Sequence, residues 1–266
     1  MRYLDELENK SIYIIREAYS RFKNIALLWS IGKDSTSLLW ICRKAFFGKI
    51  PFPVIHIDTT FKFKEIYKFR NKLSQDWHLN LIIAKNEEAL KNGMSSAKEK
   101  FKCCNSLKTE ALKISLKQFK FKTLLLAIRR DELGVRAKER YFSPRATDFT
   151  WNYENQPIEP WDLYKSKLEN EQHFRIHPML HWTELDIWRY IKKEKIPMVD
   201  LYFSKNGKRY RSIGCETCCS PVSSNAGTIN KIIRELETTA IPERSGRAQD
   251  KENSYTMQKL RSLGYM

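Results

Sequence analysis

A polar hexapeptide, Ser30-Ile31-Gly32-Lys33-Asp34-Ser35, carries side chains and backbone groups that are suited to binding phosphate. An apolar run at residues 25–29 precedes it and an apolar-periodic stretch follows it, so the hexapeptide should connect a strand to the start of a helix. Unpaired amides and the positive end of the helix dipole attract an anion at such a place. The sequence therefore predicts a nucleotide-binding loop, whose expected contact residues are Ser30, Gly32, Lys33, Asp34 and Ser35.

Each side chain of this loop has an expected task. Gly32 should permit the turn, and Ser30 and Ser35 should donate hydrogen bonds to phosphate oxygens. Lys33 should neutralise charge that develops during a reaction, and Asp34 should cap the helix or help to hold Mg²⁺. We therefore expect Lys33 and Asp34 to be catalytic. The GxxxxGK[ST] pattern of a Walker loop is absent, so transfer of a γ-phosphoryl group is not expected.

Two further polar groups follow apolar runs that are typical of buried strands. Asp58 and Thr59 come after residues 53–57, and Arg129 and Arg130 come after residues 122–128. Ligands bind beyond the carboxyl ends of strands in parallel sheets, so both groups should join the loop at one edge of the sheet. Arginine binds phosphoryl oxygens bidentately and stays charged, which makes both arginines catalytic candidates.

The six cysteines are unevenly spaced along the chain. Cys42 lies in an apolar helical stretch and is expected in the core, whereas the other five form two clusters. In the cytoplasm such clusters favour metal or sulfur chemistry over disulfides. The clustered residues are Cys103, Cys104, Cys215, Cys218 and Cys219.

Hydrophobic periodicity predicts strands that alternate with helices. This order is typical of an α/β fold with a parallel twisted sheet and helices on both faces. Expected strands are 25–29, 53–58, 79–84 and 122–128, and expected helices are 4–22, 36–45, 64–77, 108–118 and 178–193. We expect residues 1–175 to form this core, with a long polar loop from about residue 131. Residues 176–266 should form a smaller C-terminal lobe of helices and loops that carries the Cys215–Cys219 segment.

The net charge of the 266-residue chain is +17, and a polyanion such as nucleic acid would explain this excess. A general abundance of lysine is the simpler alternative. No apolar run is long enough to span a membrane, and the acidic, helical N-terminus does not resemble a signal peptide. We therefore expect a soluble cytoplasmic protein without a membrane partner.

The Ser30–Ser35 loop resembles the SxGxDS loop of the ATP pyrophosphatases, which split ATP between the α- and β-phosphates and leave an adenylylated intermediate. Further segments resemble the small subunit of sulfate adenylyltransferase and its relatives, the adenylylsulfate and phosphoadenylylsulfate reductases. These segments are residues 51–59, 63–67, 129–132, 136–140, 182–188 and 243–247. The resemblance implies an adenine nucleotide α-hydrolase-like fold that binds ATP and Mg²⁺. It also implies that Asp58 and Thr59 lie near the nucleotide, and that Arg129 and Arg130 lie near phosphate or the attacking oxyanion.

The double cysteine and the Cys215-x-x-Cys218 segment resemble the iron–sulfur ligand set of the adenylylsulfate reductases. This resemblance implies a [4Fe–4S] cluster on Cys103, Cys104, Cys215 and Cys218, with zinc or free sulfur-carrying thiols as the alternatives. Those reductases also use a nucleophilic cysteine near the C-terminus, and no cysteine follows Cys219 here. A reductase of that mechanism is therefore not expected.

DNA phosphorothioation is the function that would explain the loop, the cysteines and the charge together. In these features the chain resembles the ATP pyrophosphatases of the Dnd and Ssp systems. In this hypothesis a DNA backbone oxygen attacks the α-phosphorus of ATP, and a cysteine desulfurase supplies sulfur that displaces AMP. The first alternative is synthesis of adenylylsulfate by a sulfate adenylyltransferase small subunit beside a GTPase. Others are an adenylylsulfate reductase-like enzyme, tRNA thiolation, and a non-catalytic nucleic-acid-binding protein. The oligomeric state cannot be predicted.

Overall fold

A computed structural model describes residues 2–97, 99–165, 167, 173–248 and 256–265. Within them a six-stranded sheet has the order β3-β2-β1-β4-β6-β5, and all neighbouring pairs are parallel except β5 with β6. The strands are β1 (Ile25–Leu28), β2 (Val54–Ile57), β3 (Leu81–Ala84), β4 (Thr123–Leu125), β5 (Phe142–Arg145) and β6 (His173–Ile176). The expected α/β architecture with a mostly parallel sheet is confirmed.

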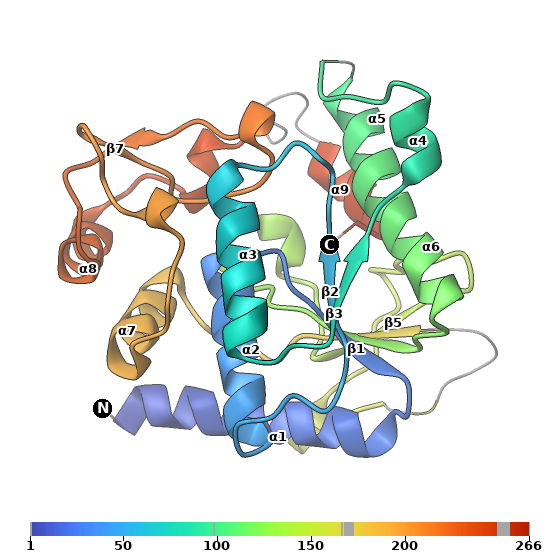
Figure 1. Ribbon diagram of the computed structural model, residues 1–266. Coiled ribbons are helices and arrows are strands. Elements are labelled where there is room, and N and C mark those ends of the chain that lie inside the picture. Colours follow the sequence, from blue (N-terminus) through green and yellow to red (C-terminus); the bar gives the residue numbers. More distant parts are fainter. Residues whose placement is uncertain (1, 98, 166, 168–172, 249–255, 266) are drawn as a thin grey trace.

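Helices cover both faces of this sheet (Figure 1). One face packs against α1 (Arg2–Arg21), α2 (Lys33–Ala45), α3 (Lys64–Asp76) and α7 (Glu184–Glu194). The other face packs against α6 (Ala111–Gln118), which continues from α5 (Lys100–Cys104) through a π-helical turn at Asn105–Glu110. The remaining helices are α4 (Glu87–Lys91), α8 (Ile229–Thr238) and α9 (Thr256–Ser262), and a small hairpin pairs β7 (Lys208–Arg209) with β8 (Val222–Ser223).

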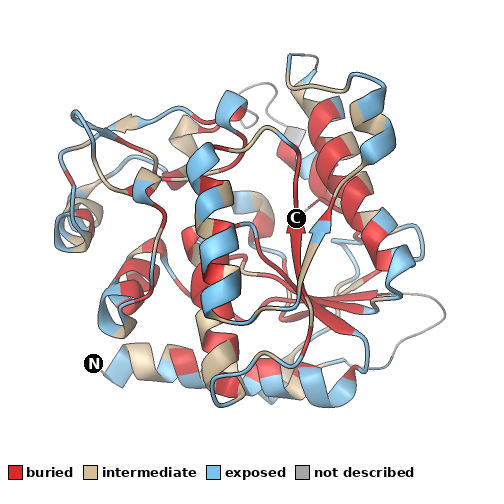
Figure 2. Cartoon of the chain, viewed as in Figure 1, coloured by how far each residue is buried: buried red, intermediate tan, exposed pale blue. Residues whose placement is uncertain are grey.

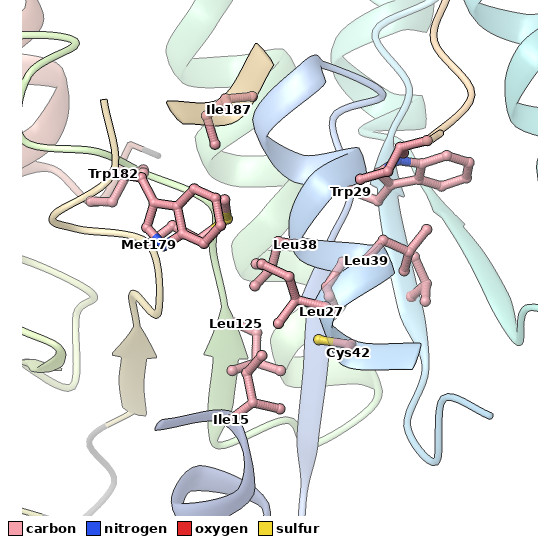
Figure 3. Packing of buried hydrophobic residues seen from close by; sticks show 14 of the residues in the cluster. Ile15, Leu27, Trp29, Leu38, Leu39, Cys42, Leu125, Met179, Trp182 and Ile187 are labelled. Atoms are coloured by element: carbon pink, nitrogen blue, oxygen red, sulfur yellow. The ribbon is translucent and has the colours of Figure 1, made fainter. Parts of the chain in front are cut away.

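The strands β1, β2, β4 and β6 are buried along their whole length, whereas the edge strand β3 is partly exposed (Figure 2). Successive side chains point to opposite sides of the sheet, so each buried strand contributes to both faces. In β1, Leu27 belongs to the cluster under α1 and α2, whereas Ala26 and Leu28 belong to the cluster under α6. Figure 3 shows the larger cluster, in which Cys42 packs near Leu39. Cys42 has no exposed surface, so its expected place in the core is confirmed.

Several predicted elements match the structure closely. The helix that follows the loop extends from Lys33 to Ala45, and α7 begins after Thr183. The Thr183 hydroxyl accepts a hydrogen bond from the Asp186 backbone N–H, and the Asp186 carboxylate accepts one from the Thr183 backbone N–H. This reciprocal capping box explains why α7 begins there.

Two strands that the sequence pattern does not reveal, β5 and β6, lie in the segment expected to be a long polar loop. Both contain charged or polar residues that are buried, such as Arg145 and Arg175. The expected division of the chain at residue 175 stays a prediction. No helix within the described residues is long and apolar enough to cross a membrane.

Candidate functional site

The Ser30–Ser35 loop lies where expected, between the carboxyl end of β1 and the first turn of α2. The Ser30 and Ser35 hydroxyl oxygens are 3.0 Å apart, and Gly32 precedes the helix without offering a side-chain cap. The loop and the first residues of α2 line a pocket, together with Leu28, Ile57 and Leu126 from the strand ends. This arrangement suits a phosphate chain, because helix N-termini bind anions.

The sharp turn of the loop depends on Ile31 rather than on Gly32. Ile31 has a φ of 68°, whereas Gly32 has a φ of −73°, which any residue can adopt. A Cβ atom at position 32 would lie 3.3 Å from the Ser30 hydroxyl oxygen and 3.6 Å from the Tyr202 hydroxyl oxygen. The Tyr202 hydroxyl also accepts a hydrogen bond of 2.8 Å from the Lys33 backbone N–H. Gly32 thus leaves room for the two hydroxyl groups that shape the loop.

The Lys33 ammonium is buried in a cluster of carboxylates. It donates to Glu243, it lies 3.3 Å from the Asp34 carboxylate, and the Glu184 carboxylate is 4.0 Å away. Burial alone would lower the pKa of Lys33, but the negative charges of Asp34 and Glu243 outweigh it and raise the pKa. Lys33 therefore stays protonated.

Arg129 completes this ion network and has no exposed surface. Its guanidinium donates to Asp34 at 2.7 Å, to Asp131 at 2.6 and 2.8 Å, and to Glu243. The Asp34 carboxylate is thereby held between Arg129 and Lys33 and makes no helix cap. In this arrangement Arg129 positions Asp34, and its donors already have carboxylate partners.

Arg130 points away from this network. Its guanidinium lies 2.9 Å from the His181 Nε2 atom and donates to the Glu139 carbonyl oxygen at 2.8 Å. It lines a separate cavity with Tyr141 and Lys10. The structure therefore does not bring Arg130 to the Ser30–Ser35 loop, although its neighbour in sequence reaches Asp34.

Asp58 and Thr59 follow β2 as expected and lie beside the pocket, whose described lining includes the preceding Ile57. Asp58 accepts hydrogen bonds from the Thr60 backbone N–H at 2.8 Å and from the Tyr67 hydroxyl at 2.9 Å. Burial would raise the pKa of Asp58, but these bonds outweigh it and lower the pKa. The Thr59 hydroxyl is 3.2 Å from the Cys215 Sγ atom, so this turn connects the sheet edge to the second cysteine cluster.

Five further cations line the pocket: Lys62, Lys108, Arg136, Arg244 and Arg247. Arg136, Arg244 and Arg247 belong to segments that carry the family resemblance, whereas no sequence pattern marks Lys62. Arg136 and Arg244 both donate to Glu132. For Lys62 and Lys108, in contrast, no ion pair with a carboxylate is found within the described residues. Burial lowers the pKa of Lys62, and the neighbouring charges of Lys108 and Arg247 lower it further. The part of the pocket lined by Lys62, Lys108 and Arg247, which we call the basic end, is therefore suited to an oxyanion.

The lack of a side chain at Gly214 leaves the space that the Arg247 guanidinium occupies. A Cβ atom at Gly214 would lie 2.4 Å from a terminal nitrogen of the Arg247 guanidinium. The guanidinium therefore lies directly on the Gly214 backbone.

The four cysteines expected to bind a cluster are buried and reduced. Burial and the neighbouring Cys104 and Cys215 thiols raise the pKa of Cys103 to about 11. Among the described residues, however, no group of three or more His, Cys, Asp or Glu side chains is arranged to hold a metal ion. The structure does not support Cys103, Cys104, Cys215 and Cys218 as a metal-ligand set.

Comparisons with known proteins decide the family. The model of the phosphoadenosine phosphosulfate reductase domain family matches residues 24–221. The chain belongs to this family. Its relatives include "Sulfate adenylyltransferase subunit 2" of Geotalea uraniireducens and of Azotobacter vinelandii, each 38% identical over the whole chain and 98% of the relative.

Solved structures of other proteins share the fold. The phosphoadenylyl-sulfate reductase of Candida auris has a TM-score of 0.56 and 18% identity, over 84% of this chain and 97% of that one. The FMN adenylyltransferase of Candida glabrata has a TM-score of 0.59 and 18% identity, over 83% of this chain and 64% of that one. The expected adenine nucleotide α-hydrolase-like fold is confirmed. The expected enzyme class, an ATP pyrophosphatase or adenylyltransferase, is confirmed as well.

The DNA phosphorothioation hypothesis is wrong. Full-length relatives at 38% identity are named sulfate adenylyltransferase subunit 2 rather than as Dnd- or Ssp-type enzymes. The hypothesis relied on net charge and on the cysteines, and neither of these identifies the acceptor of an adenylyl group. The expected DNA and cysteine desulfurase partners stay predictions.

Proposed function

We propose that this chain transfers the adenylyl group of ATP to sulfate, as one subunit of a larger enzyme. The names of its full-length relatives support both the acceptor and the existence of a second subunit. The observation that carries the proposal is the composition of the pocket, which joins an anion-binding helix N-terminus to a separate basic end.

The two ends of the pocket suggest how the substrates are arranged. ATP, entering with Mg²⁺, binds with its phosphates against the α2 amides and the Ser30 and Ser35 hydroxyl groups. The apolar residues at the strand ends provide a surface for the adenine base. Sulfate binds at the basic end, where Lys62 and Lys108 lack carboxylate partners within the described part of the chain.

The proposed reaction is one displacement at the α-phosphorus. A sulfate oxygen forms a bond to that phosphorus, and the bond to the bridging oxygen of the β-phosphate breaks. The products are adenylylsulfate and pyrophosphate, which leaves as an anion, so no protein group has to transfer a proton. Catalysis by this chain is therefore mainly positioning and electrostatic stabilisation.

The buried ion network has a supporting task in this proposal. Lys33 and Arg129 hold Asp34 at the entrance to α2, where its carboxylate also lines the pocket. One carboxylate beside the phosphates is a common arrangement for contacting Mg²⁺ that arrives with a nucleotide. The network thus orients the only acidic side chain within the Ser30–Ser35 loop.

The test is ATP–pyrophosphate exchange measured with sulfate, duplex DNA or tRNA as the acceptor, with and without the partner subunit encoded in the same genome. Sulfate alone should stimulate exchange. Lys108→Gln should raise the sulfate KM strongly. The matched control is Lys113→Gln, because Lys113 lies on α6 and pairs with Glu110; this variant should leave the sulfate KM unchanged. Stimulation by DNA or tRNA instead of sulfate would contradict the proposal.

A further inference from the structure

The C-terminal segment of the chain is anchored next to the basic end of the pocket. The Arg175 guanidinium, buried in β6, donates to the carbonyl oxygens of Gly264 and Tyr265 at 2.5 and 2.9 Å. Gly264 has a φ of +95°, and a Cβ atom there would lie 2.8 Å from the Phe149 carbonyl oxygen. The backbone therefore makes a tight turn after α9 and delivers the next side chain, Tyr265, to a fixed place.

Tyr265 is buried between an apolar cluster and the pocket. Its ring packs with Cys104, Met257 and Leu260, and the residue is 6% exposed. Tyr265 also lines the pocket together with Lys108. A side chain from the last helix thus forms part of the wall that surrounds the basic end.

Tyr265 also contacts the cation that distinguishes this end. The Lys108 ammonium donates to the Tyr265 hydroxyl oxygen at 3.4 Å and lies 5.6 Å from the ring centroid. Its other hydrogen-bond partner among the described residues is the Cys104 Sγ atom at 3.5 Å. Lys108 itself belongs to the π-helical turn at Asn105–Glu110, a local distortion that is frequent at functional sites.

We propose that Tyr265 is a specificity-determining residue: it holds the Lys108 ammonium toward the acceptor and limits the basic end to a small tetrahedral oxyanion. The inference rests on the proposed function, because it takes sulfate as the acceptor. Within the described residues the Lys108 ammonium donates to the Cys104 Sγ atom and the Tyr265 hydroxyl and forms no ion pair with a carboxylate, so it can pair with an incoming oxyanion. The rigid Tyr265 ring restricts the space beside that charge.

Two substitutions separate the two tasks of this side chain. Tyr265→Phe keeps the ring and removes the hydroxyl, so it should raise the sulfate KM about threefold to tenfold, as expected for one long hydrogen bond, and leave the ATP KM within about twofold. Tyr265→Ala removes the ring, so the rate of net pyrophosphate release from ATP with molybdate, whose adenylyl anhydride is cleaved by water to AMP, should rise relative to the rate with sulfate by roughly fivefold or more. Selenate, which is intermediate in size, should fall between them. Tyr13→Phe, on the exposed face of α1, is the matched control and should change none of these values.

The outcomes distinguish this inference from the proposed function. Wild-type protein without sulfate-dependent exchange overturns the proposed function and, with it, the role of Tyr265. Wild-type exchange with an unchanged sulfate KM in Tyr265→Phe overturns the role of Tyr265 alone. Equal rises in the KM values for ATP and sulfate would mean that the C-terminal segment only maintains the fold, and would also overturn it. Thermal unfolding shows whether each variant is folded. If Tyr265→Ala is unfolded, the sulfate KM of Tyr265→Phe, which keeps the packing, tests the role of Tyr265.

Discussion

Gly214→Ala should separate activity from stability, because the new methyl group meets only the far end of a flexible side chain. A Cβ atom at position 214 would lie 2.4, 2.5 and 2.7 Å from the three nearest atoms of the Arg247 guanidinium. Ordinary contacts begin near 3.4 Å. The guanidinium must therefore move by about 1 Å, and a shift of this size in a positioning group can reduce the reaction rate about 100-fold.

The same substitution should leave the fold intact. The φ of Gly214 lies outside the left-handed region, so alanine can adopt the backbone conformation without strain. An alanine at a compatible position restricts the unfolded chain, and this gain offsets part of the cost of moving Arg247. The free energy of unfolding should therefore change by less than about 1 kcal/mol.

The assay is sulfate-dependent ATP–pyrophosphate exchange beside urea unfolding, with two matched glycine variants. Gly134→Ala places its Cβ where no heavy atom lies within 4 Å, so both activity and stability should match the wild type. Gly246→Ala places its Cβ 2.4 Å from the Ser220 carbonyl oxygen, which belongs to the backbone, so stability should fall. Full activity of Gly214→Ala would show that Arg247 does not help to bind the acceptor.

Two further predictions concern stability. Glu139→Gln should lower the free energy of unfolding by about 3–5 kcal/mol at neutral pH, because Arg145 and Arg261 would lose their buried carboxylate partner. Burial would raise the pKa of Glu139, but the charges of Arg145, His177 and Arg261 outweigh it and lower the pKa. The wild type should therefore lose stability as the pH falls below the ordinary glutamate pKa of about 4.3. Urea unfolding at pH 7 and pH 4 should show a smaller loss of unfolding free energy for Glu139→Gln than for the wild type. Thr183→Ala should cost about 1 kcal/mol by removing the α7 cap and leave the KM values unchanged, and a change in the sulfate KM would contradict a purely structural role.

The sequence predicts the first four strands because each is an apolar run between turn signals. It does not reveal β5 and β6, because these strands bury Arg145 and Arg175. Arg145 is paired with Glu139, whereas Arg175 donates to backbone carbonyl oxygens. Glu139 is six residues from Arg145, whereas Gly264 and Tyr265 are 89 and 90 residues from Arg175. Because these partners allow charged residues to be buried in the strands, no periodic pattern of apolar residues marks them.

The two ends of the pocket also differ in how well the sequence predicts them. The Ser30–Ser35 loop is continuous in sequence and could be predicted, whereas Lys62, Lys108 and Arg247 come together only in the fold. Arg129 and Arg130 were expected to act together, but neighbouring residues in an extended segment point in opposite directions. Only Arg129 reaches Asp34.

The central claim, that sulfate accepts the adenylyl group of ATP in this pocket, is tested most directly by exchange of radiolabelled pyrophosphate into ATP. The chain, combined with its partner subunit, should catalyse exchange that depends on sulfate, and Lys108→Gln should require far more sulfate at an unchanged ATP KM. Exchange that proceeds equally well without sulfate, or a Lys108→Gln variant that matches Lys113→Gln, would contradict it.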